Sequence, residues 1–297
     1  MVESDLAAVP VNQRRFRPRQ LAGSVLSSLL VLVVCVITFF PIYWMVVTAI
    51  QPTKFSTVFP PPLAPKAISL APFRDVFAEE AIARWILNST LLALLATAIC
   101  ILLAVLGAYP LSTMRWRGRA AFAVFLLMTQ MLPEALIIVP IFEIFNDFPL
   151  LHINLRDSLF GLSLIDAAFI LPIGVWVLKN MFDTVPREVR EAATVDGAGP
   201  FRVLFEIVLP LTLPGLVAVG VVAFFYAWNE FLFAQTMIAD KALRPASVGL
   251  ASMISMLDTP IERLLAAGLL FAIPPVIFYV LMQRYVIAGI TAGAVKG

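Results

Sequence analysis

The chain has 297 residues, of which 61% are hydrophobic and 13% charged, and its mean hydropathy is +0.95. Soluble domains carry roughly 25% charged residues, so this composition excludes an ordinary water-exposed surface and indicates that lipid covers much of the chain. The formal net charge of +2 gives no support for a nucleic-acid partner.

Six apolar stretches follow one another along the chain, and each is long enough to cross a bilayer. About 20 residues are needed, because a helix rises about 1.5 Å per residue and the hydrocarbon core is about 30 Å thick. The stretches are continuously apolar and do not alternate, which favours helices over a β-barrel. We therefore expect an all-α membrane protein with transmembrane helices at 23–49, 86–110, 120–144, 159–181, 214–237 and 264–288.

Basic residues set the expected orientation of these helices. Arginines gather in the N-terminal tail, after the second predicted helix and after the fourth: Arg14, Arg15, Arg17, Arg19, Arg115, Arg117, Arg119, Arg187, Arg190 and Arg202. These three segments fall on one side, which should be the cytoplasm. Both termini are then cytoplasmic, with residues 1–20 as a tail and residues 21–297 as a single membrane domain.

The loop between the first two predicted helices, residues 50–85, falls on the outer side. It carries basic residues too, but it is long and therefore weighs less in the orientation. Within it, residues 72–84 are expected to form a short interfacial helix with Phe73, Val76 and Phe77 on one face.

The connection between the fourth and fifth predicted helices begins with a short helix. Pro186 suits a first helical turn, and Val189, Ala192 and Ala193 then fall on one small, alanine-lined face. Gly197 and the residues around it are expected to end this helix.

A second short helix is expected from Pro200. Its apolar residues recur at helical spacing and predict one stripe packed against the membrane helices: Phe201, Leu204, Phe205, Val208 and Leu209. Arg202 and Glu206 form an i, i+4 pair on the other side. The pattern supports two interpretations: a rigid helix–turn–helix that docks another protein, or an amphipathic connector that rests on lipid head groups.

This connection resembles the EAA loop of ABC-importer permeases, in which EAA is followed at fixed spacing by Gly and by I-x-L-P. The matching positions are Glu191, Ala192, Ala193, Gly197, Ile207, Leu209 and Pro210, and the DGAG that includes Asp196 is similar to the carbohydrate, maltose-type branch. Further segments that resemble this branch are Phe40–Pro52, Asn88–Thr90, Ala108–Arg119, Tyr226–Ala234 and Gln283–Gly297. The closing run Thr291–Gly297 is similar to that of the second maltose permease group within the branch.

The resemblance implies that loop 186–210 is a coupling loop held in a cleft of an ATP-hydrolysing subunit. The residues expected to make or support that contact are Arg190, Glu191, Ala192, Ala193, Asp196, Gly197, Phe201, Ile207, Leu209 and Pro210. The implied partners are two ATP-binding subunits, a homologous second permease and an extracytoplasmic solute-binding protein in a bacterial plasma membrane.

The implied function is half of an ATP-driven pathway for a sugar or oligosaccharide. The chain has no GxxxxGK[ST] phosphate loop, so ATP and Mg²⁺ are expected on the partner subunits, and this chain is expected to be no enzyme and to hold no cofactor. A lone histidine, His152, and the absence of HExxH give no sign of a metal site. Two alternatives stay open: import of glycerol-phosphate-type solutes by the same machinery, and a proton-coupled secondary transporter that uses Glu134 or Glu230.

Polar side chains inside apolar helices are the candidates for the translocation path, because an ionisable group at mid-membrane costs about 2.5–3.5 kcal/mol on insertion scales. The candidates are Asn88, Gln130, Glu134, Tyr226, Trp228, Asn229 and Glu230. Tyr226 and Trp228 offer flat faces on which a sugar ring can stack, or they form an interfacial aromatic belt. Asn88 faces the path or bonds across helices. Glu143 and Asp166 are expected near the external interface.

Overall fold

The computed structural model describes residues 18–52, 63–149, 152–255 and 259–294. Within these ranges the chain is helical, and the β-structure found there is one isolated bridge between Phe148 and Ile153. The long and bent helices are α1 (Pro18–Ala49), α4 (Ile82–Thr113), α5 (Arg119–Thr129), α6 (Glu134–Asn146), α7 (Leu159–Asp183), α11 (Leu213–Trp228) and α14 (Ile261–Ala294). The short elements are α3 (Ala71–Glu79), α8 (Arg187–Val195), α9 (Pro200–Val203), the π-helical turn η1 (Leu204–Val208), α10 (Leu209–Leu211), α12 (Leu232–Met237), the 3₁₀ turn η2 (Lys241–Leu243) and α13 (Ala246–Ser252).

Among the described residues, four helices are long and apolar enough to cross a membrane: α1, α4, α7 and α14. Two bent pairs, α5 with α6 and Pro200–Leu211 with α11, raise the number of candidate spans to six when each pair counts as one. The predicted spans at 23–49, 86–110, 159–181 and 264–288 are therefore confirmed to within a few residues at most ends.

The third predicted helix, 120–144, is not continuous. Its two halves, α5 and α6, meet at an angle of 99°. Pro133 adopts an extended backbone at the start of α6, with φ −68° and ψ 128°. Proline has no N–H to donate to the preceding turn, so the helical hydrogen-bond ladder stops there. The prediction of one continuous helix over 120–144 was therefore wrong.

The interfacial helix predicted at 72–84 is present as α3, but it ends at Glu79, and residues 82–84 already belong to α4. Val76 is buried and Phe73 half-buried, whereas Phe77 is exposed, so the predicted apolar face was partly wrong. Arg263 of α14 forms ion pairs with Asp75, at 3.5 Å, and with Glu79. These pairs fasten α3 to the start of α14.

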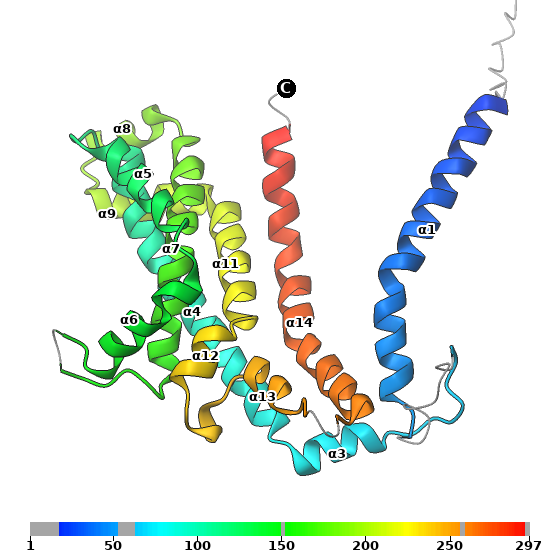
Figure 1. The fold of residues 1–297 in the computed structure, drawn as a ribbon. Helices are drawn as coiled ribbons and strands as arrows, with labels where there is room; N and C mark the ends of the chain where they lie inside the picture. Colours follow the sequence, from blue (N-terminus) through cyan, green and yellow to red (C-terminus); the bar gives the residue numbers. More distant parts are fainter. Residues whose placement is uncertain (1–17, 53–62, 150–151, 256–258, 295–297) are drawn as a thin grey trace, which may run out of the picture.

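The core of the bundle is formed by α4, α7 and α11, which lie side by side (Figure 1). Small residues allow this close approach: a Cβ on Gly174 would lie 3.2 Å from Ala104 Cβ and 3.2 Å from Val219 Cγ1. Small residues at helix contacts are how membrane helices gain packing without a hydrophobic driving force between them. Val203, Leu204 and Val208 of the following loop are buried in the same cluster.

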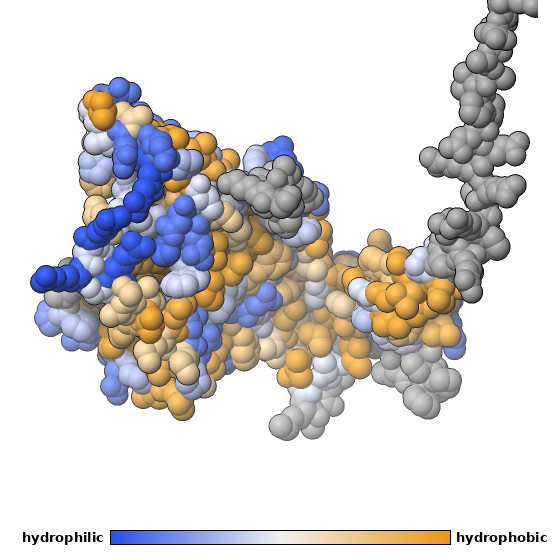
Figure 2. Space-filling model, turned by 90° about the horizontal axis from the view of Figure 1, so that it is seen from above, coloured by the Kyte–Doolittle hydropathy of each residue, from blue (hydrophilic) through white to orange (hydrophobic). Residues whose placement is uncertain are grey.

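Helix α1 stands away from this core, and the part of α1 that ends at Ala49 packs against α14 (Figure 1). Its apolar side chains are exposed over most of its length, and within its apolar window 6% of residues are buried. The described start of α1, the described end of α14 and α8 lie at one end of the molecule, and α3, α12 and α13 lie at the other. Seen from the α8 end, hydrophilic residues gather over the bundle that carries α8 (Figure 2). The N-terminal tail, residues 1–17, lies outside the described residues.

Candidate functional site

Loop 186–210 begins where α7 ends, and its first helix, α8, starts directly after Pro186 as predicted. The helix stops at Gly197, which has a φ of +85°. The Ala198 N–H donates to Ala193 O at 2.9 Å, and the Gly197 N–H donates to Thr194 O at 3.0 Å. This is a Schellman end, which needs a left-handed residue and therefore favours glycine. The turn predicted around Gly197 is confirmed, and it fixes the direction of the chain between the two short helices.

The residues of α8 that are exposed and those that are packed differ from the prediction. Ala193 is half-buried and packs against the α4–α7–α11 cluster, so it does not belong to a free alanine-lined face. Glu191 and Ala192 are exposed, and Val195 is 87% exposed. The surface that α8 offers to another molecule therefore runs along Ala192 and Val195, and Asp196 and Gly197 at its end are exposed too. Glu191 is exposed on the side of α8 that faces the end of α4.

The second part of the loop is not one regular helix. A short α-turn, α9, passes into the π-helical turn η1, in which the Leu209 N–H donates to Leu204 O. A π-turn holds more residues than an α-turn and is rare inside a helix. Pro210 follows immediately and has no N–H to offer to an α-helical ladder, and the wider turn accommodates it.

Part of the predicted stripe is wrong. Leu204 and Val208 are buried as expected, and Leu209 is half-buried, but Phe201 and Phe205 are exposed by 68% and 53%. Val203, which the prediction left out, is buried instead. Ile207 is half-buried and Pro210 exposed. The Arg202 Nε donates to Glu206 Oε2 at 2.8 Å, which confirms the predicted i, i+4 pair.

Three path candidates come together where the third span bends. The Tyr226 hydroxyl of α11 donates to Glu134 Oε1 at 2.5 Å. The Gln130 side-chain amide donates to Phe169 O of α7 at 2.8 Å. The bend between α5 and α6 is therefore tied to α11 on one side and to α7 on the other.

Other path candidates serve the fold. The Asn88 side-chain amide donates to the carbonyls of Ala242 and Arg244, both at 2.9 Å, so it bonds across elements, which was one of its two interpretations. Asn229 is exposed, and its side-chain amide donates to Phe225 O of its own helix at 2.7 Å.

Trp228 is 1% exposed, so in this conformation its ring neither lies at a membrane interface nor is open to a sugar. It stacks against Phe224 and Phe271, with ring centroids 5.8 and 5.0 Å away. Both interpretations of Trp228 drawn from the sequence differ from this placement.

Glu230 is 7% exposed and is bonded within the protein, so it does not reach toward water. Its carboxylate accepts hydrogen bonds from Phe233 N at 2.6 Å and from Ala234 N at 2.8 Å, the first turn of α12. Ser247 of α13 donates to the Glu230 carbonyl at 2.5 Å. The Glu230 side chain thus satisfies the otherwise open amides of a helix start at the break after α11.

Asp166, predicted near the external interface, is buried between helices. It is 1% exposed, and neither carboxyl oxygen has a hydrogen-bond partner among the described residues. Hydropathy alone marks Asp166 as a polar interruption of an apolar helix. Its burial depends on α7 being surrounded by other helices, which no local pattern shows.

Comparison with known proteins is consistent with this arrangement. Residues 101–291 match the model of the family described as "Binding-protein-dependent transport system inner membrane component". The inner membrane ABC transporter permease protein YcjP of Escherichia coli is 33% identical over 264 residues, which cover 88% of this chain and 92% of YcjP. The trehalose transport system permease protein SugB of Mycobacterium tuberculosis is 30% identical over 259 residues, covering 86% and 92% of the two chains.

Among solved structures, a bacterial ABC transporter involved in the import of the acidic polysaccharide alginate has a chain of the same fold. The TM-score is 0.77 at 21% identity, and the match covers 93% of this chain and 99% of that one. The fold is therefore shared with a solved transporter chain.

Proposed function

We propose that loop 186–210 couples this chain to separate ATP-hydrolysing subunits. The chain belongs to the family of binding-protein-dependent transport system inner membrane components and is a permease subunit of a sugar ABC importer. In this proposal ATP and Mg²⁺ are held by two ATP-hydrolysing subunits, and this chain contributes motion and half of the pathway. A homologous second permease and an extracytoplasmic solute-binding protein complete the importer, with both termini of this chain in the cytoplasm.

The observation that carries the proposal is the two-sided construction of loop 186–210. On the outside, Ala192 and Val195 are exposed. On the inside, Ala193 and Leu204 pack into the cluster of α4, α7 and α11. A force on the outer face of α8 therefore reaches the membrane helices through packed side chains.

The loop is also stiff enough to transmit such a force. The Gly197 turn is closed by two backbone hydrogen bonds, and the second part of the loop is held by the buried side chains of Val203, Leu204 and Val208. Closely packed interiors shift between discrete arrangements and do not deform continuously, so a tilt of α8 is passed on to α7 and α11 as a unit.

The exposed length of α1 supports a second permease as partner. A row of apolar side chains from Leu26 to Val46 is exposed and packs little against the other described parts of this chain. Lipid can cover such a row, but a second permease that packs on both α1 and the open face of α14 would also enclose a path between two halves. The second permease is expected to contribute the wall opposite Tyr226 and Glu134.

The experiment is to replace Glu191 by Arg in the full importer and to measure both the ATPase subunits that co-purify and ATP-driven sugar uptake in proteoliposomes. We expect both to fall together, because the substitution reverses an exposed charge of α8 that lies next to Ala192. Glu206→Arg is the control: Glu206 is an exposed glutamate of the same loop that pairs with Arg202. Unchanged co-purification and uptake in Glu191→Arg would refute the coupling role.

A further inference from the structure

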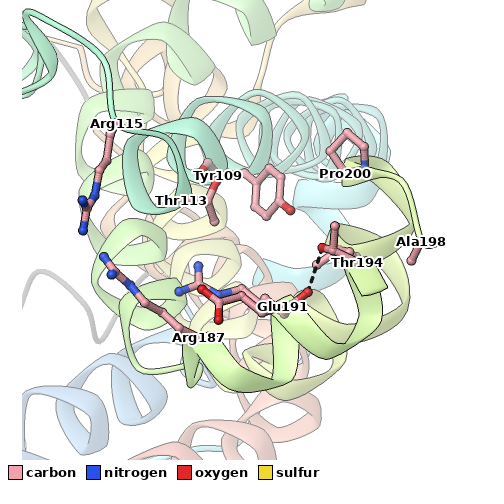
Figure 3. A pocket seen from close by; sticks show the side chains of 10 residues that line it. Tyr109, Thr113, Arg115, Arg187, Glu191, Thr194, Ala198 and Pro200 are labelled. Carbon is pink, nitrogen blue, oxygen red and sulfur yellow. Dashed lines mark hydrogen bonds between the residues drawn. The ribbon is translucent and has the colours of Figure 1, made fainter. Parts of the chain in front are cut away.

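A pocket of about 530 Å³ opens at the α8 end of the molecule, between α8 and the end of α4 (Figure 3). Three arginines line it, Arg115, Arg187 and Arg190, together with one acidic side chain, Glu191. The guanidinium groups of Arg115 and Arg187 point toward one another in Figure 3. The pocket therefore carries a net positive charge on walls that come from two separate elements.

These arginines have no ion-pair partner among the described residues, which is also true of Arg117 and Arg119 nearby. By contrast, Arg202 pairs with Glu206 and Lys179 with Asp183. Like charges that face each other repel, and an anion between them turns that repulsion into attraction. The planar guanidinium fork suits phosphate oxygens in particular.

A second, apolar cavity of about 220 Å³ adjoins this pocket and shares two of its lining residues, Tyr109 and Pro200. Its other walls come from the end of α4 and from the second part of loop 186–210: Leu106, Pro110, Met114, Phe201 and Leu204. Leu106 lies one helical turn before Tyr109, farther from the α8 end. A basic pocket thus continues along α4 into an apolar one.

We propose that the two cavities together bind one anionic phospholipid, with the phosphate among Arg115, Arg187 and Arg190 and an acyl chain along Leu106, Met114 and Phe201. A free phosphate would use the first cavity alone, and a neutral lipid would leave the arginines unpaired. Basic pockets at the cytoplasmic side of membrane helices are suited to such head groups. The exposure of Phe201, unexpected for a core stripe, then has a reason, because its ring forms a wall of the chain cavity.

The proposed lipid would join two moving parts. Arg187 belongs to α8, and Arg115 follows the end of α4. A phosphate held by both bridges the outer loop and a core helix of the bundle. This site goes beyond the coupling role proposed above and does not depend on it, because lipid retention can be measured without transport.

The test is native mass spectrometry of the full importer complex released from detergent, with phosphatidylglycerol or phosphatidylcholine added. We expect the complex to retain phosphatidylglycerol in preference to phosphatidylcholine. Arg115→Gln and Arg187→Gln should each weaken this retention about fivefold, as expected for one basic residue near a head group. Arg117→Gln is the matched control, since Arg117 lies two residues away and is not part of the lining.

The apolar cavity has its own variant. Leu106→Trp should fill the chain cavity and lower phosphatidylglycerol retention while the arginines stay in place. If Leu106→Trp fails to assemble, Met114→Trp, at a half-exposed lining residue, replaces it.

Three results would overturn the proposal. Equal retention of the two lipids, or unchanged retention in both arginine variants, would exclude a head-group site. Displacement of the lipid by inorganic phosphate, with no effect of the tryptophan variants, would show a pocket for a free anion. Cross-linking of an ATPase subunit next to Arg187, with no lipid retained by the complex, would assign the pocket to that protein.

Discussion

Tyr226 and Glu134 join two helices that are far apart in the sequence: the Tyr226 hydroxyl on α11 donates a 2.5 Å hydrogen bond to the Glu134 carboxylate at the start of α6. Glu134 directly follows the extended backbone of Pro133, where the third span bends by 99°. A bent span in a membrane leaves backbone groups that neighbouring side chains must compensate. This bond therefore fastens the bent third span to α11.

Tyr226→Phe removes this bond without changing the ring. Hydrogen bonds between membrane helices contribute about 0.6 kcal/mol on average and up to about 1.7 kcal/mol. We expect a severalfold change in ATP-driven uptake with little loss of assembled importer, because the bend loses one fastening and not its packing. Uptake by proteoliposomes, normalised to the amount of complex, measures the effect.

Glu134→Gln serves as the control for that bond, since a glutamine keeps an oxygen that can accept from Tyr226. It should behave more like the wild type than Glu134→Leu does. Equal uptake in Tyr226→Phe, Glu134→Leu and the wild type would show that the bond does not bias the transport cycle.

Glu230→Ala should act on stability. The substitution leaves the amides of Phe233 and Ala234 without their carboxylate acceptor in a buried position, and an unsatisfied buried group costs about 1–3 kcal/mol. We expect a lower Tm in detergent and faster hydrogen exchange at these two amides. A changed KM for the sugar with an unchanged Tm would instead assign Glu230 to the translocation path.

Gly197→Ala tests the turn that ends α8. At a φ of +85° an alanine is strained, and the cost of such a residue is of order 1–3 kcal/mol. Gly199→Ala is a close control, because Gly199 has a φ of −69° and a Cβ there meets nothing within 4 Å. We expect Gly197→Ala to reduce co-purification of the ATPase subunits and Gly199→Ala to leave it near the wild-type level. Equal behaviour of the two variants would show that the left-handed turn is not required.

Local information was enough for much of this fold. A transmembrane span is recognised from its own hydropathy. Gly197 predicts a helix end, because few other residues tolerate the left-handed conformation found there. The bend before Glu134 was missed because Pro133 alone does not show whether a proline kinks a span or breaks it. Whether the span kinks or breaks depends on whether Tyr226, Gln130 and their neighbours can form hydrogen bonds in place of those lost at the proline.

The remaining errors have the same origin. Trp228 looks like a free aromatic platform until Phe224 and Phe271 are placed on its faces. Phe201 fits the periodicity of the stripe but is exposed, because the buried face of this segment is set by the contacts of Val203, Leu204 and Val208 with the α4–α7–α11 cluster. Each of these features depends on contacts between segments, which periodicity along one segment does not contain.

Asp166 offers the sharpest test of how the core tolerates polarity. Its carboxyl group is buried in α7 without a partner among the described residues, so its removal from water is not compensated there. A valine has a similar size and no polar atoms, and relieving an unsatisfied buried polar group gains about 1–3 kcal/mol. Asp166→Val should therefore raise the Tm of the purified importer. Ser163→Val, on the same helix, is the control and should not raise the Tm, because the Ser163 hydroxyl already donates to Phe160 O at 2.7 Å. A lower Tm in Asp166→Val would show that the carboxyl group is solvated or paired in the membrane, and that this part of α7 faces a polar space.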